Sequence, residues 1–357
     1  MDRLGIGLGL TAGLALFLYG LGRLAHGMRA VAGDRLRAAL ARATRTRLIA
    51  ASAGAGVTAV LGSSSVAIIL VIALVDAGLV PATRALGVVL GANVGTTVSS
   101  QVIALDVERY APLVLVLGLA LATLSGRHPT RGATGQAVGT AVFGLGLVFF
   151  GLGHMAAAVE PLRDSARFTA WMTRLESPLA GAAAGALTTL VIQSSSATIG
   201  IAITLASQGL LTLPAGVAVM LGAEIGTCAD TLVATLGRSR AALRVGAFHL
   251  AFNVATVAIG LVLVGPLTAL ARALGGDAAR QVANAHVAFN ALGALLALPV
   301  LPLVARALER LVPAPDAMPD AMPDAAPDAT PDAAPGGVPV PVAGDAPDGA
   351  RGEAGKG

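Results

Sequence analysis

Charged and aromatic side chains are scarce in this chain of 357 residues. Charged residues make up 12% of the sequence, against about 25% in typical soluble proteins, which argues against a soluble globular domain. Aromatic residues make up 3%, so the basic pI of about 10.1 comes without the stacking surface typical of nucleic-acid binding, and we expect no nucleic-acid partner. Cys228 is the only cysteine, which excludes an intramolecular disulfide.

Apolar side chains, in contrast, make up 55% of the sequence, and the mean hydropathy is +0.79. Several apolar stretches approach the roughly 20 residues that a membrane-spanning helix needs. The sequence therefore predicts an all-α polytopic protein that lies in a lipid bilayer. We expect full spans at residues 5–26, 85–105, 110–126, 133–156, 215–236, 242–266 and 283–305.

Three pairs of segments match at a constant spacing of 131 residues, which indicates an internal repeat. A Ser triplet and a Gly-Ala-x-x-Gly-Thr box are among them, and chance rarely aligns both in a chain rich in Ala, Leu and Gly. The matching pairs are residues 13–22 with 144–153, 63–65 with 194–196, and 91–96 with 222–227. We therefore divide the chain into a first membrane repeat at 1–130, a second repeat with the last spans at 131–312, and a tail at 313–357.

Two segments, at about 48–76 and 179–209, are centred on the Ser triplets. Each consists of two apolar arms of about 12 residues, which rise about 18 Å as helices against a hydrocarbon core of about 30 Å. Each segment therefore fits a re-entrant helical hairpin that enters and leaves the membrane on one side. Such breaks are tolerated at membrane depth only where protein buries them or where they line a wet cavity.

The arginines indicate the orientation of the spans. The segment after the first predicted span carries six arginines and one acid, Asp34, so we place it in the cytoplasm and the N-terminus outside. Since the hairpins do not cross, three full spans precede the second repeat, which is then inverted. Inverted repeats with paired broken helices are typical of secondary transporters. The Ala/Gly/Arg-rich composition is typical of a GC-rich bacterial genome. We expect a multi-pass protein of the bacterial inner membrane.

The tail that follows the last predicted span has a different composition. From Pro315 onward the chain repeats Pro-Asp-Ala and then becomes rich in Gly and Pro. Because it has few apolar groups to bury, we expect a disordered tail in the cytoplasm.

The Ser triplets fall at the predicted hairpin tips, where helix N-terminal N–H groups favour an anion. Hydroxyl groups there can bind an oxyanion or a cation without adding charge. The tip residues that we expect to bind substrate or ion are Gln193, Ser194, Ser195, Ser196 and Thr198, and in the first repeat Ser63, Ser64 and Ser65. The first repeat has Gly62 where the second has Gln193. The alternative is that the hydroxyls only cap or pack the helices.

The two boxes place polar side chains inside predicted spans. Asn93, Thr96 and Thr97 lie at i, i+3 and i+4, on one helix face, and Glu224 and Thr227 take the matching places in the second box. A carboxylate inside a membrane costs about 2–3 kcal/mol or more. Glu224 is therefore a candidate functional residue by default.

The last two spans carry two His-x-x-Phe-Asn motifs, in which His and Asn share a helix face. The motifs begin at His249 and His286 and end at Asn253 and Asn290. We favour hydrogen bonding across helices over a direct ligand role for them. Asp230 lies six residues after Glu224, and a functional role and a structural role are equally open for it.

Together these motifs resemble the type II sodium/phosphate cotransporter family over about residues 10–305. The resemblance implies one substrate site between two inverted repeats, transport of inorganic phosphate driven by sodium, and no cofactor beyond the coupling Na⁺. Sodium would be bound by residues drawn from Gln193, Ser195, Asn93 and Glu224. Two departures from the family pattern concern cation binding: Gly62 stands where the family has Gln, and Glu224 stands where it has Asn.

Other functions fit parts of the same pattern. A carrier of this architecture could move another anion, export phosphate, or use protons, since Glu224 can hold one. A more distant alternative is an intramembrane serine hydrolase that uses His249 or His286, but neither Ser triplet has the Gly-x-Ser-x-Gly elbow that a nucleophile usually needs. A membrane scaffold without transport has only the tail in its favour.

Overall fold

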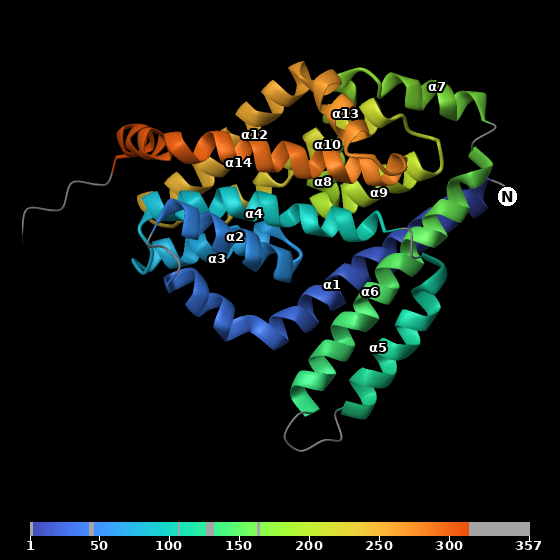
Figure 1. Cartoon of the computed structure of the whole chain (residues 1–357), viewed down its shortest axis with the longest axis horizontal. Coiled ribbons are helices and arrows are strands. Elements are labelled where there is room, and N and C mark those ends of the chain that lie inside the picture. The colour runs from blue at the N-terminus through green and yellow to red at the C-terminus, as the bar shows by residue number, and fades with distance from the viewer. Residues whose placement is uncertain (1–2, 43–45, 106–107, 126–131, 163–164, 314–357) are drawn as a thin grey trace, which may run out of the picture. The chain divides into compact units, whose positions relative to one another are not determined.

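The computed structural model describes residues 3–42, 46–105, 108–125, 132–162 and 165–313 (Figure 1). These ranges contain helices and no β-strand, so the predicted helical class is confirmed. The predicted disordered tail at 313–357 lies outside the described residues except for Pro313.

Within the described ranges, six helical segments are long and apolar enough to cross a membrane, and they correspond to six of the seven predicted spans. They are α1 (Arg3–Arg42), α4 (Ala82–Ile103), α6 (Gly132–Val159), α10 with α11 (Leu213–Gly226 and Cys228–Val233), α12 (Arg240–Val262) and α14 (Ala278–Leu311). The seventh predicted span is α5 (Ala111–Ser125), whose 15 residues rise about 22 Å. That is less than the hydrocarbon thickness of about 30 Å.

Some boundaries differ from the prediction for local reasons. The first span belongs to a helix that continues to Arg42, because residues 29–42 are mostly Ala, Arg and Leu, which favour helix. The last span likewise continues to Leu311, with Pro299 and Pro302 inside it. In the second box, α10 and α11 meet at Thr227, whose φ of −64° and ψ of −20° are helical, and together they form one candidate span, whereas the first box lies within the single helix α4.

Shorter helices complete the described chain. Two pairs occupy the segments predicted as hairpins: α2 (Arg47–Leu61) with α3 (Ser64–Asp76), and α8 (Pro178–Ile192) with α9 (Ser195–Ser207). The others are η1 (Glu108–Tyr110), η2 (Glu160–Leu162), α7 (Ala166–Arg174) and α13 (Val264–Ala273).

The two short-helix pairs have the same local structure. Their bounds correspond residue for residue at the spacing of 131. Gly62 ends α2 with φ 66°, and Gln193 ends α8 with φ 60°. The hydroxyls of Ser63 and Ser194 accept hydrogen bonds from the backbone at the start of α3 and α9. Since a left-handed residue closes a helix most easily when it is Gly, Gln193 holds a strained position that Gly62 holds freely.

Glycines allow each short-helix pair to pack closely on the following span. A Cβ at Gly91 of α4 would collide with the carbonyl of Ala51 in α2, and a Cβ at Gly222 of α10 would collide with the carbonyl of Ala182 in α8. The same close approach therefore occurs in both halves, at equivalent residues.

A second glycine contact joins α1 and α6, which run antiparallel. A Cβ at Gly13 would lie 2.9 Å from the carbonyl oxygen of Gly151, and a Cβ at Gly20 would lie 2.8 Å from that of Gly144. Gly144 and Gly151 are the repeat counterparts of Gly13 and Gly20. Gly13 therefore contacts the counterpart of Gly20, and Gly20 contacts the counterpart of Gly13. α5 packs on the same helix, α6, as Figure 1 shows.

The apolar core has two main parts, each containing one of the tip helices. One part packs α9 with α1, α6, α10 and α14, around side chains such as Ile199 and Met220. The other packs α3 with α2, α4, α12 and α14, around Ile68 and Leu90. A re-entrant hairpin requires that protein bury its break or that the break line a wet cavity. Both tip helices are buried in protein, which is compatible with that requirement.

We predict that Gly91→Ala lowers stability by about 1–3 kcal/mol or more, because the added methyl group has no space against Ala51. The matched control is Gly56→Ala in α2, where a Cβ meets nothing within 4 Å. Apparent melting temperatures of the purified variants in detergent check this. A Gly91→Ala variant as stable as the control would contradict the close packing of α2 on α4.

Candidate functional site

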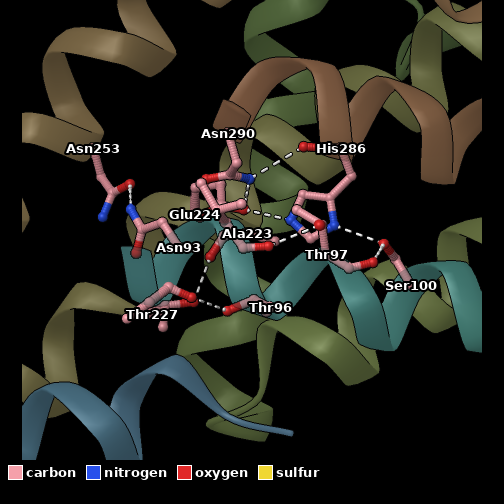
Figure 2. Close-up of polar contacts among 12 residues, drawn as sticks. Asn93, Thr96, Thr97, Ser100, Ala223, Glu224, Thr227, Asn253, His286 and Asn290 are labelled. Carbon is pink, nitrogen blue, oxygen red and sulfur yellow. Dashed lines mark hydrogen bonds and ion pairs between the residues drawn. The ribbon is translucent and has the colours of Figure 1, made fainter. Parts of the chain in front are cut away.

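Helices α4, α10, α11, α12 and α14 contribute polar side chains to one buried network, in which two groups of side-chain hydrogen bonds are joined where the Cys228 thiol donates to the backbone carbonyl of Glu224. Figure 2 shows the part of this network around Asn93, Glu224 and His286. In the apolar surroundings of a membrane span, each of these groups needs a partner from the protein. The members are Asn93, Ser100, Glu224, Cys228, Thr231, His249, Asn253, His286 and Asn290.

Glu224 is the only acidic member of this network, and it is 5% exposed. Its Oε1 lies 2.8 Å from Nε2 of His286 and accepts a hydrogen bond of 3.0 Å from the amide of Asn290. Nδ1 of the same histidine lies 2.8 Å from the hydroxyl of Ser100. A single histidine therefore connects the second box to the first-repeat helix α4, as Figure 2 shows.

The partners of Ser100 assign the protons on His286. The Ser100 hydroxyl donates to the carbonyl of Thr97 at 2.8 Å, so it accepts from Nδ1–H of the imidazole. The remaining bond, between Nε2 and Glu224, then contains one proton. The pair is either an ion pair or a neutral acid with a neutral imidazole, and the geometry serves both forms.

The second histidine has a different environment. Nδ1 of His249 lies 2.8 Å from the hydroxyl of Thr231, and its Nε2 lies 4.0 Å from the thiol sulfur of Cys228. The amide of Asn253 lies 3.3 Å from the same sulfur, and the amide of Asn93 donates to Asn253 at 2.9 Å. No carboxylate bonds to His249 directly in the described ranges.

The two halves use the two His-x-x-Phe-Asn motifs reciprocally. Asn93 and Glu224 are counterparts, and they bond to Asn253 on α12 and Asn290 on α14. Ser100 and Thr231 are also counterparts, and they bond to the histidines of α14 and α12. The prediction that these motifs hydrogen-bond across helices is confirmed. Sequence reasoning missed Ser100 and Thr231, although their spacing of 131 was available as a signal.

The threonines of the boxes bond within their own helices. The hydroxyls of Thr96, Thr97 and Thr227 donate to backbone carbonyls three or four residues earlier. In the described structure these three hydroxyls make no hydrogen bond to another helix. They differ in this from Asn93 and Glu224, which bond across helices.

The Ser tips lie on helices that contact the opposite half. α3 contacts α11 and α12, and α9 contacts α4 and α14. At the first tip, Ser64 is buried and the side chain of Ser65 lies beside the carboxylate of Asp230. Each tip helix thus touches the span that carries the other half's box.

The second tip has a different set of partners. Ser195 and Ser196 are both buried, whereas Gln193 is exposed and its side chain folds back to the carbonyl of Leu190. The hydroxyls of Thr198 and Thr189 bond at 2.7 Å. Of the four predicted sodium ligands, Asn93 and Glu224 belong to the buried network, and no hydrogen bond in the described structure joins them to Gln193 or Ser195.

The first tip lacks this threonine pair. Thr58 is the counterpart of Thr189, but Ala67 stands where the second half has Thr198. The hydroxyl of Thr58 is fully buried and has no hydrogen-bond partner in the described structure. The two tips therefore differ at Gly62, at Ala67 and in the carboxylate that Ser65 contacts.

The network resembles a Ser–His–Glu triad in outline, but its chemistry differs. Ser100 lies inside the continuous helix α4, is 2% exposed, and donates its proton to a backbone carbonyl. The surrounding N–H groups are used by the helix, so none is available as an oxyanion hole. This arrangement holds helices together and does not prepare a nucleophile.

Six membrane-length helices, two Ser-tipped helix pairs and a buried polar network define a multi-pass membrane protein. The described residues contain no group of three or more His, Cys, Asp or Glu side chains that could hold a metal ion. The chain belongs to the Na⁺/Pi-cotransporter family, whose model matches residues 16–157 and again residues 162–300.

Relatives extend over most of the described chain. "Uncharacterized protein YqeW" of Bacillus subtilis is 32% identical over 307 residues, which is 85% of this chain and 97% of that protein. "Putative inorganic phosphate export protein YjbB" of Salmonella typhimurium is 30% identical over 304 residues, again 85% of this chain. This chain spans 55% of the length of YjbB.

A human relative matches a shorter part. "Sodium-dependent phosphate transport protein 2B" is 26% identical over 170 residues, which is 46% of this chain and 20% of that protein. No solved structure matches this chain significantly.

We predict that His286→Phe lowers stability by about 3–5 kcal/mol, because it leaves Glu224 buried without its imidazole partner. Adding Glu224→Leu should recover part of this loss, with a coupling of about 0.5–3 kcal/mol. Melting temperatures of both single variants and the double variant in detergent measure the coupling. The matched control is His154→Phe, at an exposed histidine of α6. Strictly additive effects would contradict the His286–Glu224 bond.

Proposed function

We propose that this protein is a secondary transporter that moves inorganic phosphate across a bacterial inner membrane, coupled to sodium. The observation that carries the proposal is the pair of Ser-tipped helix breaks, each buried in protein and each touching the opposite half. Helix N-termini with hydroxyl groups suit an anion, and neighbouring oxygens suit a cation. Family membership supports phosphate and sodium as the transported ions.

We further propose that the two halves are inverted repeats and that α2–α3 and α8–α9 are re-entrant hairpins. The antiparallel packing of α1 on α6 with exchanged glycine contacts supports an inverted relation. So does the reciprocal use of α12 and α14 by Asn93 and Glu224. In such a transporter the substrate site lies between the repeats and is exposed alternately to each side.

Polar contacts between the halves support the proposed sidedness. On the side assigned to the cytoplasm, Asp76 accepts from the backbone N–H of Ser239 at 2.8 Å and pairs with Arg238 at 3.3 Å. The hydrogen bonds from Ser239, together with the Arg238 charge, lower the pKa of Asp76 from its usual value. On the opposite side, Gln101 bonds to Arg280 and Asn284. Each group of contacts joins only segments that the topology assigns to one side.

The proposed roles of the site residues follow this division. We assign substrate and ion binding to the two tips, with Gln193, Ser194, Ser195, Ser196 and Thr198 at the second and Ser63, Ser64 and Ser65 at the first. Asn93, Thr96, Thr97, Glu224 and Thr227 supply the adjoining helix faces. Glu224, held by His286 and Asn290, is a modified cation ligand in this scheme.

The direction of transport is a second element of the proposal. A sodium-coupled carrier moves phosphate inward under the ordinary sodium gradient, whereas the name of YjbB describes export. We propose coupling to sodium, with the direction set by the ion gradients and with phosphate export and proton coupling as the alternatives.

We predict that proteoliposomes containing the protein accumulate ³²P-phosphate under an inward sodium gradient, since sodium entry supplies the driving force. A matched proton gradient without sodium is the second condition, and empty liposomes are the control. Uptake that requires only the proton gradient would replace sodium with protons as the coupling ion. No phosphate movement in either direction under any gradient would contradict phosphate transport.

We also predict that Gln193→Gly separates stability from function. Glycine relieves the left-handed backbone strain, worth about 1 kcal/mol, so the variant should melt at a higher temperature than the wild type. Loss of the amide should nevertheless reduce phosphate uptake at least about tenfold, which corresponds to about 1.4 kcal/mol of binding. The comparison is Gln193→Ala, which loses the amide but keeps the strain. Full uptake by Gln193→Gly would remove this side chain from the site.

A further inference from the structure

The second half contains another intramembrane carboxylate that the buried network does not use. Asp230 lies in α11, inside the candidate span Leu213–Val233. Its Oδ1 accepts from the backbone N–H of Thr231 at 2.7 Å, and the side chain of Ser65 lies beside its carboxylate. No Arg, Lys or His side chain within the described ranges forms an ion pair with it.

Asp230 lies at the first Ser tip, although it belongs to the second half. Ser65 is in the first turn of α3, and α3 contacts α11. The counterpart of Asp230 in the first half is Ser99, whose hydroxyl oxygen lies 4.0 Å from the place that a Cβ on Gly62 would take. Positions 99 and 230 therefore both adjoin the tip at residues 62–65.

There is open space beside Gly62. A cavity of about 210 Å³ is lined by Gly62 and Ser99, together with apolar side chains of α1, α2, α4 and α6. In the second half, the position of Gly62 is occupied by Gln193. The tip serines and Asp230 do not line this cavity, so it does not mark the place of the ligand.

The chemistry of the first tip favours a cation. A carboxylate and hydroxyl groups are hard oxygen ligands of the kind that hard cations prefer. Asp230 is half-buried near the end of the candidate span, and a half-buried carboxylate without a positive partner is stabilised by a bound cation. The second tip carries Gln193 and a satisfied threonine pair, and no acidic side chain bonds to it in the described structure, so its helix N-terminus remains suited to an anion.

We propose that Asp230 is a ligand of a coupling cation bound at the first Ser tip, and that the anion binds at the second tip. This inference rests on the proposed function and assigns a different ion to each tip. The carboxylate of Asp230 belongs to the second half, whereas the serines of the first tip belong to the first half. Cation binding would therefore hold α3 against α11, and so one repeat against the other.

The other role that the geometry allows is purely structural. An acidic residue in the first turn of a helix is stabilised by the helix dipole, and Asp230 is in the first turn of α11. In that case, neutral variants would melt at a lower temperature, but their response to sodium would not change.

The first readout is the stabilisation of the purified protein by sodium, measured as the rise in melting temperature in NaCl relative to choline chloride. A ligand that binds the folded state raises stability with its concentration, so this readout does not depend on transport. The variants are Asp230→Asn and Asp230→Ser, the latter being the residue at position 99. The control is Glu309→Gln, which removes a carboxylate far along α14.

We expect both Asp230 variants to need at least about tenfold more sodium for half-maximal stabilisation, and Glu309→Gln to match the wild type. Ser65→Ala, which keeps the carboxylate, should show a smaller shift in the same direction, and it tests the site even if the Asp230 variants do not fold. An unchanged sodium response in Asp230→Asn or Ser65→Ala would overturn the inference, as would a wild-type protein that sodium does not stabilise.

The second readout separates this inference from the proposed function. In proteoliposomes, the sodium concentration for half-maximal ³²P-phosphate uptake should rise at least about tenfold in Asp230→Asn. If the wild type binds sodium through Asp230 but carries no phosphate, the proposed function fails and the cation site stands. If phosphate uptake is driven by sodium equally well in wild type and Asp230→Asn, the function stands and the cation site is wrong.

Discussion

The rest of this structure depends on one constraint, which is that polar groups surrounded by apolar side chains or lipid must find their partners within the protein. A helix break among apolar groups is costly unless its ends are capped, and Ser63 and Ser194 cap the helices that begin at the two breaks. Side chains such as Glu224 and His286 meet the same requirement by bonding across helices that are distant in sequence. The polar contacts that make a site possible are therefore also the ones that fix the positions of α4, α10, α12 and α14.

Duplication provides two copies of this solution, and the differences between the copies carry the functional information. The backbone of each tip is the same, down to a left-handed residue before the capping serine. The side chains have diverged, because Asn93 and Glu224 occupy equivalent places with different charge, and so do Ser99 and Asp230. The transporter that we propose couples an anion to a cation and needs two unlike sites, and we assign that difference to these substitutions.

Much of the architecture could be predicted from the sequence. Long apolar stretches predicted the helices, since only a helix satisfies its own backbone in lipid, and the repeat spacing located both short-helix pairs. One exception has a local cause: the first helix continues to Arg42, beyond the apolar stretch, because the residues there favour helix. The site was less predictable. Glu224 stood out because a buried charge is unusual, whereas Ser100 and Thr231 look like ordinary polar residues of a helix until their partners are known.

The sequence by itself determined the helical class, the repeat, the family motifs and the residues at each tip, because these depend on composition and on spacing along one chain. Only the tertiary structure decided which histidine pairs with Glu224, how the two His-x-x-Phe-Asn motifs are shared between the halves, and that Ser65 meets Asp230 from the other half. These contacts join residues more than 15 positions apart. They are set by how helices pack against one another, and the pattern of a single helix does not contain that information.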